Sequence, residues 1–154
     1  MDAASINPAS PTPVTAERLT TVLTSLGLKS QPADTNPQGV LVGFLDLLLQ
    51  FTVAGDTLHC AGQWRGEPPE DMVLPLIAGT SAFNTQQIFP TLAVQHTDTS
   101  LVVIMTRSAD IAFGLTDDQL TTWIASSIHQ FGEAGKWLAE NFPQAVTWNE
   151  GDPQ

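Results

Sequence analysis

The sequence has very little positive charge. Its 154 residues include five lysines and arginines against sixteen aspartates and glutamates, which gives a formal net charge of −11. The field of such a chain repels phosphate backbones and anionic lipid headgroups. We therefore expect neither nucleic acid nor a membrane as a partner. The five cations are scattered along the chain, at Arg18, Lys29, Arg65, Arg107 and Lys136.

Cysteine and metal-ligand spacings are also scarce. Cys60 is the only cysteine, so no internal disulfide can form and nothing indicates an oxidising compartment. The three histidines lie far apart, and no C-x-x-C or H-x-x-x-H spacing occurs. No glycine loop suited to a phosphate group appears either. We predict neither a metal site nor a cofactor.

Long hydrophobic runs are missing. No stretch reaches the roughly 18 apolar residues that a membrane span needs. The beginning, MDAASINPASPTP, has no basic start and no apolar run, which is not the pattern of a signal peptide. We expect a soluble cytoplasmic protein. Residues 13–146 should form a single domain, with disordered tails at 1–12 and 147–154.

Two segments have the spacing of amphipathic helices. Residues 15–28 place apolar side chains on one stripe, with Thr15 as a suitable N-cap and Gly27 suited to the end. A longer stripe runs from Asp117 to about Phe142. Residues 29–39 contain two prolines and several turn formers, and we interpret them as a loop.

Five segments are predicted to be strands. They are residues 40–44, 47–53 and 57–65, and two strands within 91–113 around a polar turn. Most alternate between an apolar and a mixed face, which favours an antiparallel sheet covered on one side. Leu101–Met105 is apolar on both faces, and we expect it to be an inner strand covered on both sides.

Residues 66–84 predict a further helix, although its helical pattern is weaker than that of the other two. Pro75 has no N–H, so we expect an irregular first turn and a regular helix from about Pro75 onward. The apolar spacing gives the following candidate buried residues: Val73, Leu76, Ile77, Thr80 and Phe83.

Asp117 and Asp118 raise the question of a catalytic carboxylate pair. Thr116 and Gln119 flank them in the T-x-x-Q spacing of a capping box. Adjacent helical residues diverge by about 100°, so the two carboxylates cannot converge on one substrate atom. We interpret the pair as first-turn residues that suit the helix dipole.

His59 and Cys60 are the only adjacent base and nucleophile. Successive strand residues point to opposite faces, so these two side chains cannot form a dyad. Cys60 is on the apolar face and is most simply a small core residue. His96 or His129 could still approach it from elsewhere in the chain, although no spacing favours this.

Aromatic side chains are the remaining candidates for function. They either pack the core and its corners or form an apolar surface for a protein partner or a second copy. The candidate partner or dimer surface residues are Trp64, Phe83, Phe89, Trp123 and Trp137.

Three segments carry a family resemblance: GQWRGEPPE, FNTQQIFP and GLTDDQLTTWIASSIHQFGEAGKWLAENFP. Together they resemble the YbjN family of bacterial sensory transduction regulators over residues 15–143. The chain departs from the family where Phe83–Asn84 replaces a common Trp-Asn. The resemblance implies a fold similar to type III secretion chaperones, with a five-stranded antiparallel sheet, packed helices and a tendency to dimerise. It implies no reaction.

We therefore expect a two-layer α+β domain with the order α-β-β-β-α-β-β-α. Its expected function is non-enzymatic protein binding, chaperone-like or regulatory, through apolar surfaces of a homodimer. Two alternatives stay open. One is a regulator of a signalling protein that holds no client, and the other is a small enzyme that uses Cys60.

Overall fold

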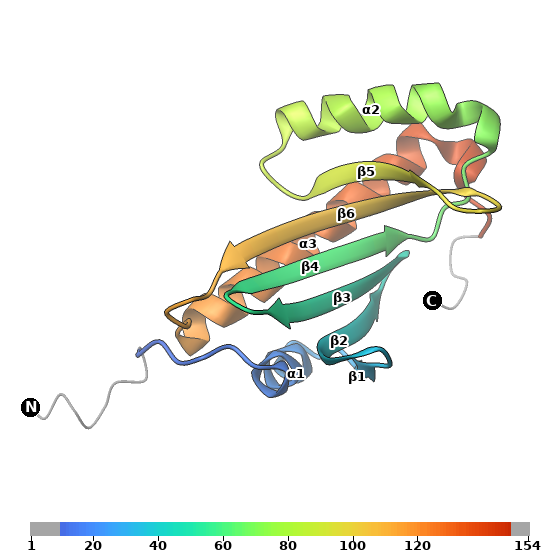
Figure 1. The fold of residues 1–154 in the computed structure, drawn as a ribbon. Helices are drawn as coiled ribbons and strands as arrows, with labels where there is room; N and C mark the ends of the chain where they lie inside the picture. Colours follow the sequence, from blue (N-terminus) through green and yellow to red (C-terminus); the bar gives the residue numbers. More distant parts are fainter. Residues whose placement is uncertain (1–9, 149–154) are drawn as a thin grey trace, which may run out of the picture.

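A computed structural model describes residues 10–148, so most of each tail predicted at 1–12 and 147–154 lies outside the described residues. Helices and strands follow one another along the chain as shown in Figure 1. The helices are α1 (Ala16–Ser25), α2 (Val73–Gln86) and α3 (Asp117–Asn141), with 3-10 turns η2 (Glu70–Met72) and η3 (Pro143–Ala145). The strands are β1 (Ser30–Ala33), β2 (Asn36–Phe44), β3 (Leu47–Ala54), β4 (Thr57–Trp64), β5 (Thr91–His96) and β6 (Leu101–Asp110).

The sheet has six antiparallel strands in the order β1-β2-β3-β4-β6-β5. The predicted five-stranded sheet is wrong by one strand, because residues 30–33 form β1 rather than a loop. β1 pairs with β2 through a tight turn at residues 34–35, with a register shift after Pro32. Proline is tolerated here because β1 is an edge strand. The predicted strand 40–44 correspondingly begins earlier, at Asn36.

Helices cover one face of the sheet. α1 packs against β2 and α3, and α3 crosses β3 and β4 behind the sheet in Figure 1. The strand residues that point to these helices are buried, including Leu49, Phe51 and Met105 at 0% exposure. They meet Ile124 and Phe131 of α3, which are also fully buried. The core therefore lies between the sheet and the α1–α3 layer.

The other sheet face has no helix over it in the part of the chain that the structure describes. Its side chains, such as His59, Ala61 and Gln63, are exposed. The expectation that Leu101–Met105 is covered on both sides is therefore wrong, because Val102 and Ile104 point to this open face and are half-buried. Their partial cover comes from neighbouring strands, since β6 lies between β4 and β5.

α1 and α3 begin where the sequence predicts. The Thr15 hydroxyl accepts a bond from the Arg18 amide, and Gly27 adopts a positive φ of 81° just after the helix. The helix starts are tied together, because the Arg18 guanidinium contacts Asp117 at 2.9 Å and the Leu115 carbonyl at 3.0 Å. Thr12 pairs with Leu115, so the packed chain already includes residue 12, just outside the predicted domain boundary.

α2 lies beside edge strand β5 and is irregular at its start, as Pro75 predicts. The 3-10 turn Glu70–Met72 precedes the α-helix, which begins at Val73. Pro75 therefore falls in the first helical turn, where backbone N–H groups have no helical partner. Regular helix begins two residues earlier than predicted for this reason.

The predicted buried face of α2 is only partly correct. Leu76 and Thr80 are buried and Phe83 is half-buried, but Ile77 is 45% exposed. Nearly every residue of the helix is apolar or small, so spacing alone could not separate its two faces. The outward face carries Leu74, Ile77, Ala78 and Ser81, all exposed.

Candidate protein-binding surfaces

The five predicted aromatic residues do not form one surface. Trp64 is 1% exposed, so its assignment to a partner surface is wrong and core packing is correct. Its indole N–H donates to the Asp46 carboxylate at 3.0 Å, which satisfies its one polar atom. Trp148 packs edge-on against it at 6.2 Å, so the packed chain also extends beyond the predicted boundary at 146.

Phe89 and Trp123 enclose Arg107. The guanidinium carbon lies 3.7 Å from the Phe89 ring centre and 4.7 Å from that of Trp123. Arg107 also donates to the Trp123 carbonyl and to the hydroxyls of Ser126 and Ser127. Burial lowers the pKa of the guanidinium, and only an ionised Cys60 would oppose this. These contacts join β6, α3 and the segment between α2 and β5, and they account for both aromatic residues within the chain.

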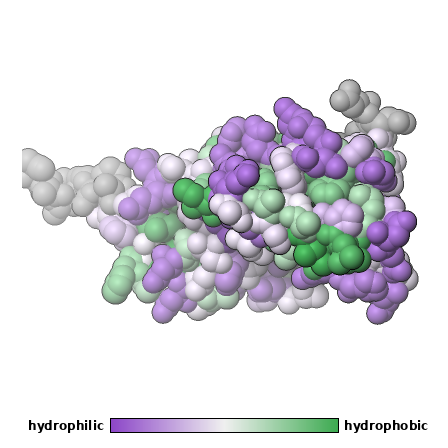
Figure 2. Space-filling model, turned by 90° about the horizontal axis from the view of Figure 1, so that it is seen from above, coloured by the Kyte–Doolittle hydropathy of each residue, from purple (hydrophilic) through white to green (hydrophobic). Residues whose placement is uncertain are grey.

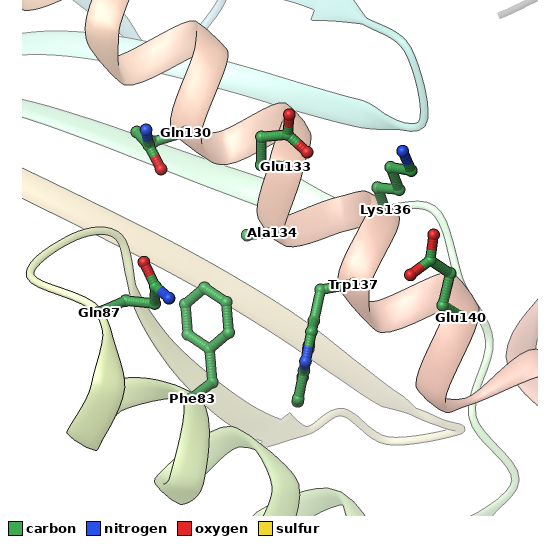
Figure 3. A pocket seen from close by; sticks show the side chains of 8 residues that line it. All are labelled: Phe83, Gln87, Gln130, Glu133, Ala134, Lys136, Trp137 and Glu140. Carbon is green, nitrogen blue, oxygen red and sulfur yellow. The ribbon is translucent and has the colours of Figure 1, made fainter.

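Phe83 and Trp137 are brought together, and they line a groove between α2 and α3 (Figure 3). Their ring centres are 5.1 Å apart, and Phe142 lies 6.1 Å from Trp137. The groove encloses about 290 Å³. Its rim is polar, with Gln87, Gln130, Glu133, Lys136 and Glu140. An aromatic floor with a polar rim can receive a side chain from a protein partner.

The most exposed apolar side chains near α2 were not among the candidates. Leu74 is 75% exposed, Ile77 is 45% exposed and Ile88 is 96% exposed. Figure 2 looks down on this side of the molecule and shows a cluster of hydrophobic residues bordered by hydrophilic ones. The sequence contained one signal that could have identified the region. No Asp, Glu, Lys or Arg occurs from Met72 to Gln95.

The aspartate pair starts α3, as the capping interpretation predicts. The Thr116 hydroxyl accepts from the Gln119 amide at 3.0 Å, and the Gln119 side chain accepts from the Thr116 amide at 2.9 Å. The Asp117 carboxylate forms an ion pair with Arg18 rather than facing Asp118. The pair is therefore structural rather than a site for acid–base chemistry.

Cys60 is in the core and is 1% exposed. Burial raises the pKa of its thiol well above the usual range, with the Arg107 charge as a smaller opposing effect. His59 points to the open face, where its Nδ1 lies 2.7 Å from the Ser108 hydroxyl on the neighbouring strand. His96 instead contacts Glu70 at the molecular surface. A buried, protonated thiol without a histidine beside it is a poor nucleophile.

Residues 10–148 offer no other kind of site among those considered for the sequence. In this range, no group of three or more His, Cys, Asp or Glu side chains could hold a metal ion. None of the helices described has both the length and the apolar character needed to cross a membrane.

Known proteins similar to this chain share its architecture. The family model "YbjN: Putative bacterial sensory transduction regulator" matches residues 15–140. The crystal structure of YbjN from E. coli, "a putative transcription regulator", has a TM-score of 0.73 at 19% identity, covering 85% of this chain and 95% of that chain. An uncharacterized protein from Methanothermobacter thermautotrophicus has a TM-score of 0.52 at 15% identity, covering 84% and 99%. At such identities the two structures show the fold alone. No curated protein matches the chain.

Proposed function

The chain belongs to the YbjN family, and from this we propose that it is a non-enzymatic domain that binds protein as a homodimer. The single observation that carries the proposal is the exposed, uncharged face of α2. Leu74 and Ile77 are apolar side chains left in contact with water on a helix without any charged residue. Contiguous exposed apolar surface of this kind is typical of protein interfaces.

The net charge of −11 restricts where two copies can meet. Each copy repels the other, so a stable contact must form where charge is absent. Residues 72–95 provide the longest uncharged segment of the chain, and α2 presents its outward face. Charge and exposure therefore both favour α2 as the contact between copies.

A two-fold axis at Ser81 fits the side chains of this face. In an antiparallel pair of α2 helices centred on Ser81, Ile77 of one copy meets Thr85 of the other, and Leu74 lies beyond the last turn of the partner helix. The small residues Ala78, Ser81 and Ala82 then lie at the crossing, where they permit close approach. A symmetric arrangement buries the same patch twice. The Phe83–Trp137 groove lies on the opposite side of α2 and stays open for a partner.

The mode of action is regulatory or chaperone-like. The family description supports regulation of another protein. The resemblance to type III secretion chaperones supports holding of an unfolded client. A holding chaperone suppresses aggregation of an unfolded client at equimolar ratio, whereas a regulator changes the activity of a folded partner. An aggregation assay therefore separates the two modes.

Cysteine cross-linking tests the dimer surface. Cys60 is buried, so a new surface cysteine is the only accessible thiol. We expect Ser81→Cys to form a covalent dimer rapidly on mild oxidation, because the two-fold axis places it against the partner's Ser81. Thr122→Cys, exposed on α3, is the matched control and should stay monomeric on a denaturing gel. Equal and slow cross-linking of both variants would place the contact elsewhere.

A further inference from the structure

The turn between β2 and β3 holds a leucine in an unfavourable backbone conformation. Leu45 has φ of 55°, and it is the only non-glycine residue with positive φ in the part of the chain that the structure describes. Glycine or asparagine usually occupies such a position, because a side chain crowds the backbone there. Leu45 is 55% exposed, so burial compensates little of this strain. Strain of this kind marks candidate functional positions.

Two hollows adjoin this turn on the open face of the sheet. The larger encloses about 470 Å³ and is lined by residues that include Leu45, Leu48 and Gln63. The smaller encloses about 270 Å³ and includes Leu41. Gly43 and Leu48 line both, so the two hollows adjoin each other, and Leu48 is 53% exposed. We call this surface, lined by Leu41, Gly43, Leu45, Leu48 and Gln63, the hairpin groove.

Positive charge is concentrated at the ends of the hairpin groove. Lys29 lines the smaller hollow beside β1, and Arg65 lines the larger one beyond β4. These are two of only five cations in a chain of net charge −11. Three strand spacings, about 14 Å, separate β1 from β4. Asp46 is the acidic residue in the lining, and its carboxylate accepts the Trp64 indole bond.

We propose that the hairpin groove binds a short segment of a partner protein. This segment would carry leucine-like apolar side chains flanked by acidic residues. The leucines of the groove would contact the apolar side chains, and Lys29 and Arg65 would attract the flanking carboxylates. This inference rests on the proposed protein-binding function and names the chemistry of the partner. The open, shallow shape suits a peptide better than an enclosed small molecule. A second copy is disfavoured because the proposed contact between copies lies on α2, whose residues do not line the groove.

A labelled peptide tests the proposal. The probe is a ten-residue fluorescent peptide of alternating leucine and glutamate, measured by fluorescence anisotropy up to about 1 mM. One control peptide has serine for leucine, and the other has lysine for glutamate. We expect both control peptides to bind at least tenfold more weakly. The lysine peptide is the sharper control, since the overall charge of −11 would favour it. Equal or tighter binding of the lysine peptide would overturn the proposal.

Variants locate the binding. Leu45→Asn and Leu48→Ser should each weaken binding of the leucine–glutamate peptide at least tenfold. Phe113→Asn, at an exposed apolar residue outside both the groove and α2, should not. Leu45→Asn should also raise Tm by about 2–4 °C, because asparagine tolerates this backbone conformation. Weaker binding from a more stable protein cannot result from misfolding. Amide chemical shift changes should lie at Gly43, Leu48 and Gln63, and changes confined to α2 would contradict the assignment.

Other occupants give different results. Deletion of residues 149–154 should leave peptide affinity unchanged, and a tenfold gain would assign the groove to this segment and overturn the proposal. Loss of the dimer in Leu48→Ser would assign the hairpin groove to a second copy, which also overturns the proposal. The dimer surface is tested separately by Ser81→Cys. An intact dimer that binds no peptide would reject this inference alone, and peptide binding by a monomer would reject the dimer alone.

Discussion

Individual side chains determine where the helices begin. Thr15 and Thr116 each accept a bond from the backbone of the first turn, and Gln119 completes a capping box at α3. Such caps satisfy backbone N–H groups that have no helical partner. The spacing of these residues was sufficient to predict both starts. The same local rule explains Asp117 and Asp118 without any catalytic role.

Replacement of Thr116 tests the cap. We expect Thr116→Ala to lower the free energy of unfolding by about 1 kcal/mol, because the first turn loses its hydroxyl acceptor. Asp118→Asn should have a smaller effect. Urea denaturation measures both. Thr122→Ala is the control on the exposed surface of the same helix and should change stability little. A loss of partner binding at unchanged stability in Asp117 or Asp118 variants would contradict the capping account.

Cys60 should make the protein less stable at alkaline pH. Burial raises the pKa of the folded thiol, while the unfolded thiol has a pKa of about 8.5. Above pH 8.5 the unfolded chain therefore binds fewer protons than the folded one, and the free energy of unfolding falls as pH rises. The loss of unfolding free energy that Cys60 causes approaches about 1.4 kcal/mol per pH unit.

Urea denaturation of the native protein and Cys60→Ala at pH 7, 9 and 10 measures this effect. The variant should lose less stability than the native protein over that range. Iodoacetamide should label Cys60 slowly in the folded protein and rapidly in urea. If stability falls equally with pH in the native protein and in Cys60→Ala, or if the folded protein is labelled rapidly, the thiolate is accessible. Either result would reopen the alternative of a cysteine-dependent enzyme.

At the scale of elements, α2 and β5 depend on one asparagine. The Asn84 side chain donates to the Leu92 carbonyl at 2.8 Å and accepts from the Leu92 amide at 2.7 Å. It therefore takes the place of a neighbouring strand at the exposed edge of β5. This contact holds α2 beside the sheet and reduces the chance of edge-to-edge association.

Removal of the Asn84 amide should be costly. We expect Asn84→Ala to lower the free energy of unfolding by about 1–3 kcal/mol, because both Leu92 backbone groups lose their partner. Asn84→Asp should be comparably destabilising, since a carboxylate would face the Leu92 carbonyl. Thr85→Ala is the adjacent, exposed control and should be nearly neutral. Equal stability of the native protein and Asn84→Ala in urea would show that solvent replaces the contact.

The sequence predicted some elements better than others for physical reasons. α1, α3 and strands β3 and β4 have clear periodicity and local caps or turns, so their positions follow from nearby residues. β1 contains Pro32 and no apolar alternation, and only its pairing with β2 defines it. The two faces of α2 could not be distinguished, because a mostly apolar helix has no periodic signal. Its exposed side became evident only beside β5.

At the scale of the whole molecule, family and fold class were predictable, while the surfaces were not. Residues 15–140 match the family that the resemblance indicated. The aromatic residues, however, were assigned to a surface by type alone. Trp64 is in the core, and Phe89 and Trp123 enclose Arg107, a residue 16 positions or more away in sequence from both. Such contacts depend on strand order, which local sequence patterns do not determine.

The α2 face should hold two copies together through apolar contacts without charge. Leu74→Glu combined with Ile77→Glu would place four carboxylates in the symmetric contact, where burial and mutual repulsion oppose association. Both positions are exposed in the single chain, so the fold itself should be retained. Phe113→Glu is the matched control, because Phe113 is 94% exposed and lies outside α2. It should leave the dimer intact.

Sedimentation equilibrium at micromolar concentration tests this central claim most directly. The account predicts a single species of twice the 16.5 kDa chain mass for the native protein and for Phe113→Glu. It predicts the mass of one chain for the Leu74→Glu, Ile77→Glu variant. A native protein that sediments as a single 16.5 kDa species would contradict the homodimer, and a dimer that survives in the double variant would contradict its placement on α2.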